Sequence, residues 1–346
     1  TPAAERRAAT LTARRSLKGD WQAAWLLNAV RCIDLTTLSG DDTPDRVARL
    51  CAKARQPVDA GQLRALGVDR LTTGAVYALI ALGLTLIYGV LHIINFAHGA
   101  LLTAAMFAVF FTYQLFGIDP YVAAVGLTPL FFVIGYVVQR YVIGPAAHGD
   151  DRNILLVTLG LAVVIENALL YAFRADTRTI NLPYAFDVIE FGNAFLAKPR
   201  VIACSAVVGV AVVLGIFMRF TSTGKAIRAV AKEKLGAELA GIDVAHIYAV
   251  TFGLGTACLA IAACLLMPTY YVNPHAGNAF VLVAFTVVVL GGMGSVAGAL
   301  LGGLFVGVVE SLCGLYLGGS LGQIGNIVMF ILVLLLRPNG LFGERA

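Results

Sequence analysis

The sequence predicts an all-α, polytopic membrane protein with eight to nine transmembrane helices, preceded by a short soluble helical fragment. Hydrophobic residues make up 59 % of the 346 residues and charged residues only 13 %, with a mean hydropathy of +0.84. An ordinary soluble domain is about one quarter charged. From residue 71 onward, apolar runs recur near the ~20 residues that a spanning helix needs. The composition therefore excludes a soluble enzyme for most of the chain.

Residues 1–66 differ from the rest, because the first 70 residues alone hold 12 Lys/Arg and 8 Asp/Glu. The string DLTTLSGDDTPDRVARLCAKARQPV, Asp34–Val58, resembles the amino-terminal part of deoxyribose-phosphate aldolases. That family is a TIM barrel with a Schiff-base lysine on a later strand, and such a barrel needs roughly 200 residues or more. Lys18 and Lys53 match no catalytic motif of the family. We therefore predict an inert aldolase-like fragment in residues 1–66, either a fusion or an artefact, and a membrane domain in residues 67–346.

Each apolar run of the membrane domain is expected to be a helix. The run Ala279–Leu290 is too short to span alone, so it is expected to be a tilted short helix or a re-entrant half-helix. The runs are Leu71–Val90, Ala97–Leu115, Tyr121–Val138, Ile154–Phe173, Val201–Phe220, Ile247–Met267, Ala279–Leu290, Val296–Leu317 and Leu321–Leu336.

The short loops set the orientation, because Lys and Arg are enriched in cytoplasmic loops. The loop after Phe220 is the most basic, so we place it in the cytosol. With nine crossings the chain then enters the membrane from outside and ends inside, and the basic tail of residues 1–70 would lie outside. Nine basic residues fall on the inner face and four on the outer face. The inner group is Arg140, Arg152, Arg219, Lys225, Arg228, Lys232, Lys234, Arg337 and Arg345; the outer group is Arg174, Arg178, Lys198 and Arg200.

A polar break interrupts the first two runs within GLTLIYGVLHIINFAHG, residues 83–99. Its polar residues include Asn95 and His98, which are costly at membrane depth unless they face protein or water. One interpretation is a broken segment beside the translocation path. The plainer one, which we favour, is a tight turn between helices with His98 as a cap.

The charged stretch from Thr223 to Asp243 is expected to be a cytoplasmic helix that grips a soluble partner. Its apolar residues Ile227, Val230, Leu235 and Leu239 could form one docking face. Gly241 is expected to end the helix with a positive φ. The alternative is an amphipathic helix lying on lipid headgroups.

The glycine-rich stretch VVVLGGMGSVAGALLGG, residues 287–303, is expected to allow close helix packing. Gly294, Gly298 and Gly302 recur every four residues, which predicts a flat strip on one helix face. We expect Gly298→Leu to impair transport more than Ala299→Leu, which lies about 100° around the helix. A sharper interpretation is a hinge at Gly291, Gly292 and Gly294.

Two acids, Glu166 and Glu310, lie within apolar runs and have no sequence-near basic partner. An intramembrane carboxylate is a functional candidate by default, although each could also serve packing. The sequence has no phosphate-binding loop, no HExxH and no zinc-type Cys/His pairing. We therefore expect no ATP hydrolysis by this chain, no metal, no cofactor and no nucleic acid partner.

The strings GLTLIYGVLHIINFAHG, TGKAIRAVAKEKLGAELAGI, VVVLGGMGSVAGALLGG and RPNGLFG together resemble the permeases of branched-chain amino acid ABC importers, of the LivH type. The resemblance implies a multi-pass subunit of the bacterial inner membrane. It also implies four kinds of partner: a second permease, two cytoplasmic ATPases, a periplasmic substrate-binding protein and membrane lipid.

By the same resemblance, the ATPase-coupling loop includes Lys225, Arg228, Glu233, Ala237 and Gly241. Candidates for the substrate pathway are Asn95, His98, Glu166, Gly291, Gly292 and Gly294. The alternatives are a permease for urea or short amides, or an ion-coupled secondary transporter, which would need coupling carboxylates near the midplane.

Overall fold

The computed structural model describes most of the membrane domain. The described residues are 60–146, 151–180, 182–184, 187–191, 194–292, 294–317, 322–336 and 340. The aldolase-like string and almost all of residues 1–66 lie outside these ranges, and so does the C-terminal motif apart from Gly340.

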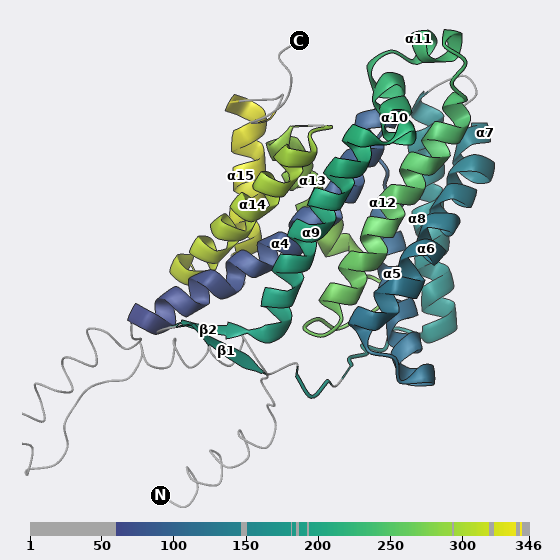
Figure 1. Ribbon diagram of the computed structural model, residues 1–346. Helices are drawn as coiled ribbons and strands as arrows, with labels where there is room; N and C mark the ends of the chain where they lie inside the picture. Colours follow the sequence, from purple (N-terminus) through teal and green to yellow (C-terminus); the bar gives the residue numbers. More distant parts are fainter. Residues whose placement is uncertain are drawn as a thin grey trace, which may run out of the picture.

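Nine long helices carry the described chain back and forth (Figure 1). Each of the nine predicted runs coincides with one of them, so the predicted fold class is confirmed. Six apolar spans of 18 to 27 residues are long enough to cross a membrane, the longest of them running from Pro120 through Ala146, and two further apolar helices are shorter. The nine are α4 (Ala60–Leu91), α5 (Ala97–Phe116), α6 (Pro120–Val138), α8 (Asp151–Phe173), α9 (Lys198–Phe220), α12 (Val244–Leu266), α13 (Ala276–Gly291), α14 (Val296–Leu317) and α15 (Gly322–Leu336).

Short elements cap the two ends of this bundle. A π-helical turn (Gln139–Ile143), α7 (Gly144–Ala146), α10 (Ser222–Lys232) and α11 (Lys234–Leu239) lie at the upper end in Figure 1. A small antiparallel hairpin of β1 (Val188–Phe191) and β2 (Ala194–Ala197), which the sequence did not predict, lies at the lower end.

Several basic residues lie at the ends of the bundle to which the orientation prediction assigned them, while Arg337 and Arg345 lie outside the described residues. Arg219, Lys225 and Arg228 lie in or beside α10, and Arg140 approaches Asp243, just after α11, at 3.9 Å. At the other end, the backbone of Arg178 pairs with Val272 beyond the end of α12. We therefore call the α10 end cytoplasmic, and this assignment of faces stays a prediction.

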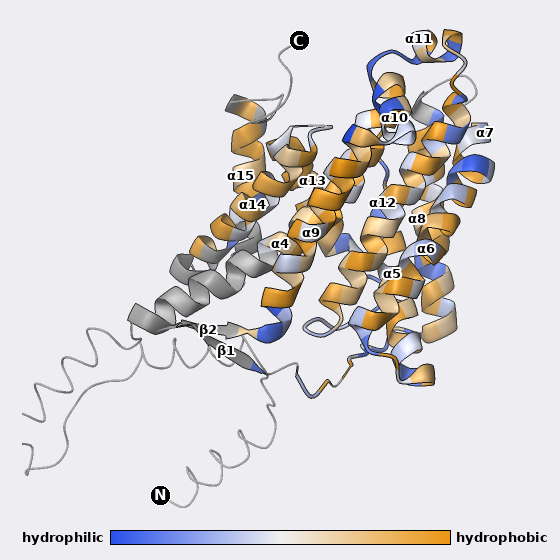
Figure 2. Cartoon of the chain, in the orientation of Figure 1, coloured by the Kyte–Doolittle hydropathy of each residue, from blue (hydrophilic) through white to orange (hydrophobic). Residues whose placement is uncertain are grey.

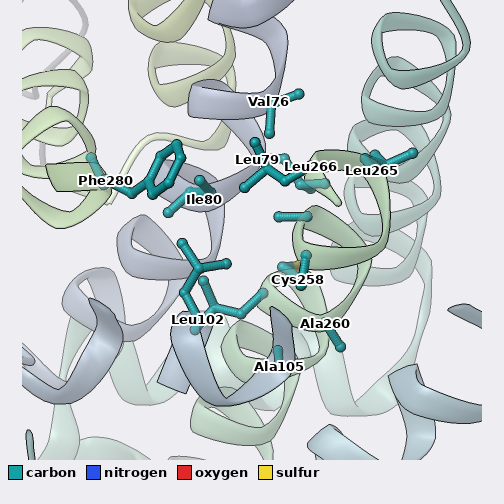
Figure 3. Close-up of a cluster of buried hydrophobic side chains, with 14 of the residues drawn as sticks. Val76, Leu79, Ile80, Leu102, Ala105, Cys258, Ala260, Leu265, Leu266 and Phe280 are labelled. Carbon is teal, nitrogen blue, oxygen red and sulfur yellow. The ribbon is translucent and has the colours of Figure 1, made fainter. Parts of the chain in front are cut away.

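Two helices form the centre of the fold. In α4, 83 % of the Gly74–Leu91 span is buried, and in α12 89 % of the Val244–Leu266 span is buried, against 11 % in α8 and 17 % in α9. Figure 3 shows how side chains of α4, α5, α12 and α13 meet around Leu79, Leu102 and Cys258.

Glycines allow the central helices to approach closely. Such small residues are common where helices pack in membranes, because apolar side chains gain little by leaving lipid for another helix. A Cβ on Gly74 of α4 would lie 2.9 Å from the Gly303 carbonyl oxygen of α14. A Cβ on Gly83 would lie 2.7 Å from the Gly255 carbonyl oxygen of α12, and Gly99 of α5 is similarly close to Gly277 of α13. Larger residues at these positions would push the helices apart.

The peripheral helices α6, α8 and α9 present mostly apolar side chains outward (Figure 2). In α9, for example, Val208, Val212, Val213 and Ile216 are all about half exposed or more. Such a surface fits the hydrocarbon of a bilayer.

Candidate functional site: the α4–α5 break, the glycine turn and the α10–α11 loop

The α10 helix begins where the sequence supplies a cap. The Thr221 hydroxyl oxygen accepts a hydrogen bond from the Gly224 amide at 2.9 Å. Gly224 lies against the backbone of Phe217 and Met218 at the end of α9, so α10 folds back sharply onto the bundle. The capping hydroxyl and the absent side chain thus fix the angle at which the loop leaves the membrane.

One face of α10 docks on the chain itself. Ile227 and Val230 are buried, and they form a small cluster with Val90 of α4 and with Val244 and Ile247 of α12. Lys225, Arg228 and Lys232 are exposed on the other side of the helix.

The single docking face expected from Ile227, Val230, Leu235 and Leu239 is therefore wrong. Leu235 and Leu239 in α11 are 64 % and 83 % exposed. The reason is local: Glu233, between the two helices, is extended at φ −152° and ψ 101°, so the helical phase of α10 does not continue into α11.

The end of α11 has the conformation that the sequence predicted. Gly241 has φ +81°, its amide donates to the Glu238 carbonyl, and the next amide, of Ile242, donates to the Ala237 carbonyl at 3.0 Å. The neighbouring Asp243 then caps α12 by accepting from the His246 amide. Two more residues were expected in the coupling loop. Glu233 lies directly before α11, and Ala237 lies on the buried side of α11.

The break between α4 and α5 turns the chain back along α4. His92 has φ +56°, and the Asn95 side-chain oxygen accepts from the Ala97 amide at 3.0 Å. The His98 Nε2 lies 3.0 Å from the Ile80 carbonyl oxygen. Ile80 is 11 residues, or about 16 Å of helix, before Leu91.

His98 is therefore not a helix cap, because it fastens the first turn of α5 to the middle of α4. Asn95 and His98 are only 2 % and 0 % exposed, so neither faces an open path in this conformation. The exposed residues of the break are His92, Ile94 and Phe96.

Glu166 has a basic partner that lies 109 residues away in the sequence. Its Oε1 is in hydrogen-bonding contact with Nδ1 of His275, directly before α13, and accepts from the Asn278 amide at 3.2 Å. A lone charged side chain in the bilayer costs about 3 kcal/mol on insertion scales. The histidine and the amide reduce that cost.

Glu310 of α14 accepts hydrogen bonds from side chains of two other helices. It accepts from the Asn326 amide of α15 at 3.0 Å and from the Tyr77 hydroxyl of α4 at 3.5 Å. Asn326 and Tyr77 are buried. This carboxyl group therefore ties three helices together inside the bundle.

The glycine-rich stretch is a tight turn followed by a helix. Gly292 and Gly294 both have φ +92°, and α14 starts only at Val296. Gly294 therefore does not belong to the helical strip expected for it. Gly298 and Gly302 do lie on α14, and both face the end of α13, with the backbone of Gly291 against Gly298.

Ala299 does not offer the milder position that was expected. It is 0 % exposed, whereas Ala297 is exposed. The 100° offset was correct as geometry, but the side of α14 that carries Ala299 is covered as well: one turn later, Gly303 lies against Ala78 of α4.

Two residues of the Glu166 cluster were missed at the sequence level, namely His275 and Asn278. The signal was weak, because both residues lie just before the short apolar run Ala279–Leu290, where a polar loop residue is ordinary. Their proximity to Glu166 is a property of the tertiary structure alone.

The chain resembles known transport proteins over most of its length. A family model described as the permease component of branched-chain amino acid transport systems matches residues 68–336. The high-affinity branched-chain amino acid transport system permease LivH of Escherichia coli K12 is 32 % identical over 291 residues, which is 79 % of this chain and 93 % of LivH. The corresponding permease BraD of Pseudomonas aeruginosa is 32 % identical over 293 residues, or 80 % and 94 %.

An enzyme is similar to a short part of the chain, and a solved structure is similar to most of it at low sequence identity. The deoxyribose-phosphate aldolase of Bos taurus is 57 % identical over 77 residues, which is 22 % of this chain but only 24 % of the aldolase. Among solved structures, PsaBC from Streptococcus pneumoniae in complex with Fab has a TM-score of 0.44 at 14 % identity, over 85 % of this chain and 97 % of that chain.

The aldolase resemblance is thus real but spans about a quarter of that enzyme. The permease resemblance, together with the apolar helices, shows a multi-pass protein of the bacterial inner membrane. By the family model and by its relatives, the chain belongs to the family of permease components of branched-chain amino acid transport systems.

Proposed function

We propose that this chain is one of two permease subunits of an ATP-driven importer for branched-chain amino acids. In this proposal the permease domain is residues 67–346, and residues 1–66 take no part in transport. ATP is hydrolysed by two cytoplasmic partner subunits, and a periplasmic protein delivers the amino acid to the outer face.

The observation that carries the proposal, beside family membership, is the exposed surface of α10 and α11. It combines basic side chains with two exposed leucines, Leu235 and Leu239, at one end of the bundle. A cluster of exposed apolar and charged groups on a loop is suited to a protein partner. The lipid-headgroup alternative is less favoured, because the apolar face of α10 is already covered by α4 and α12.

A series of contacts connects α10 to the turn between α13 and α14. Val90 of α4 packs with Ile227 of α10. One residue earlier, Gly89 lies against Gly294 in the turn between α13 and α14. A movement of α10 would thus reach the glycine turn through a single turn of α4, which supports alternating access driven from the cytoplasmic side.

The test is transport by the reconstituted complex. The chain, its second permease, the ATPases and the binding protein are placed in vesicles, and leucine uptake is measured with and without ATP. We expect uptake that requires ATP. Uptake driven by an ion gradient without the ATPases would replace the proposal with secondary transport, and uptake of urea but not leucine would change the substrate class.

A further inference from the structure

The polar cluster of Glu166, His275 and Asn278 lies on a surface that the rest of the described chain leaves open. The side chains of His275 and Glu166 are 59 % and 23 % exposed, and Asn278 is exposed too. The second intramembrane carboxyl group, Glu310, differs because its partners Tyr77 and Asn326 are 7 % and 3 % exposed. The Glu166 cluster is therefore accessible to a ligand from outside this chain.

The cluster lies inside the membrane domain, on the outer half. Glu166 precedes Phe173, the end of α8, by seven residues, which is about 10 Å of helix. His275 follows Val272 by three residues, and Val272 pairs with Arg178 beyond the end of α8. A carboxyl group and an imidazole at this depth need water, protein or a polar ligand rather than hydrocarbon.

The same face becomes apolar toward the cytoplasmic side. Leu282 is one helical turn beyond Asn278 on α13 and is 64 % exposed. Further along α13, the ring of Phe285 lies 6.2 Å from the ring of Phe96, which is 41 % exposed in the α4–α5 break. Polar and apolar groups thus follow one another over two turns of helix, or about 10 Å.

This order of groups matches the two ends of an amino acid with a hydrocarbon side chain. The Glu166 carboxylate can accept from an α-ammonium group, while the Asn278 side-chain amide can donate to an α-carboxylate. The contact with His275 holds the Glu166 carboxylate in place beside Asn278. Leu282 and Phe96 would contact the hydrocarbon end.

We propose that Glu166, positioned by His275, and Asn278 hold the α-ammonium and α-carboxylate groups of the amino acid in the outer half of the translocation path, with Leu282 and Phe96 beside its side chain. The proposal rests on the proposed function and gives it a site. It also places the face of α8 and α13 on a water-filled path rather than on lipid.

The first experiment makes the same change, glutamate to glutamine, at two positions in the reconstituted complex. Glu166→Gln should lower ATP-dependent leucine uptake per assembled complex by at least about tenfold, the effect of losing one charge-assisted hydrogen bond. Glu310→Gln is the matched control and should stay close to the parent. Equal uptake by the parent and Glu166→Gln would overturn the site.

A selectivity measurement separates binding from a structural role. The complex is assembled without the binding protein, and compounds are compared for their ability to displace radiolabelled leucine. From the parent complex, 4-methylpentanoate, which is leucine without its ammonium group, should displace leucine poorly. For Glu166→Gln the two compounds should become nearly equal competitors. An unchanged preference in Glu166→Gln would count against contact with the ammonium group.

Thiol labelling tests the position of the site independently of transport. Asn278→Cys should react with a charged, membrane-impermeant thiol reagent, and leucine should slow the reaction. Val212→Cys, on the apolar face of α9, should stay unreactive. An unreactive Asn278→Cys, or labelling that leucine does not slow, would refute the proposal. If leucine slows the labelling of Asn278→Cys as expected but the parent complex takes up no leucine, the result would instead refute the proposed function.

Discussion

Gly89 in the last turn of α4 lies directly against Gly294 in the turn between α13 and α14: a Cβ on Gly89 would come within 2.8 Å of the Gly294 Cα. The neighbouring Val90 packs with Ile227 and Val230 of α10. The last turn of α4 therefore touches both α10 and the glycine turn.

The first prediction concerns this contact. Gly89→Val should reduce leucine uptake strongly while the complex still assembles, because overpacking costs ~1–3 kcal/mol and the two access states would bear it unequally. Uptake and ATP hydrolysis are measured per assembled complex. Gly126→Val in α6, where an added Cβ would meet nothing within 4 Å, is the control. Equal activity of both variants would show that the contact does not matter for transport.

The second prediction concerns the end of α11. Gly241→Val should weaken stimulation of the ATPases with normal membrane insertion, because a positive φ costs an L-residue roughly 1–2 kcal/mol and a β-branched one more. Gly241→Asn should be milder, since asparagine tolerates this conformation. Substrate-stimulated ATP hydrolysis that is the same in the valine variant and the parent would contradict a role for this turn.

The third prediction separates the two faces of the cytoplasmic loop. Leu239→Asp should reduce binding of the ATPases without destabilising the permease, because Leu239 is exposed. Ile227→Ala should instead destabilise the permease by about 2–5 kcal/mol, because Ile227 is 0 % exposed. Co-purification of the ATPases and thermal unfolding of the permease distinguish the two. Normal ATPase binding by Leu239→Asp would move the docking surface elsewhere.

The fourth prediction concerns packing of α14 on α13. Gly298→Leu should impair transport more than assembly, because the Gly291 carbonyl already occupies the space of a side chain. Ala297→Leu, at an exposed position one residue earlier, replaces Ala299→Leu as the control and should be close to the parent. Leucine uptake is normalised to the amount of complex. Two variants that both behave like the parent would show that this helix contact can shift at no functional cost.

The fifth prediction concerns the amino-terminal segment. Removing residues 1–66 should leave transport intact, because the first apolar run begins at Leu71 and the family model begins at residue 68. Uptake by the truncated and full chains is compared at equal insertion. Lost transport with normal insertion would reveal a role for the segment. The full chain should also cleave no deoxyribose phosphate.

The sequence by itself determined the approximate positions of the nine long helices in the described chain, because a bilayer of fixed thickness selects apolar runs of about 20 residues, a strictly local property. It also determined the positive φ of Gly241, since a residue without Cβ takes that conformation at a helix end.

Only the tertiary structure decided which side chains meet. It brought Glu166 to His275 across 109 residues, and it covered Ala299 on the side of α14 that was expected to be open. It also turned Leu235 and Leu239 away from Ile227, because one extended residue, Glu233, resets the helical phase. Such contacts depend on how distant helices cross, which no local pattern of residues encodes.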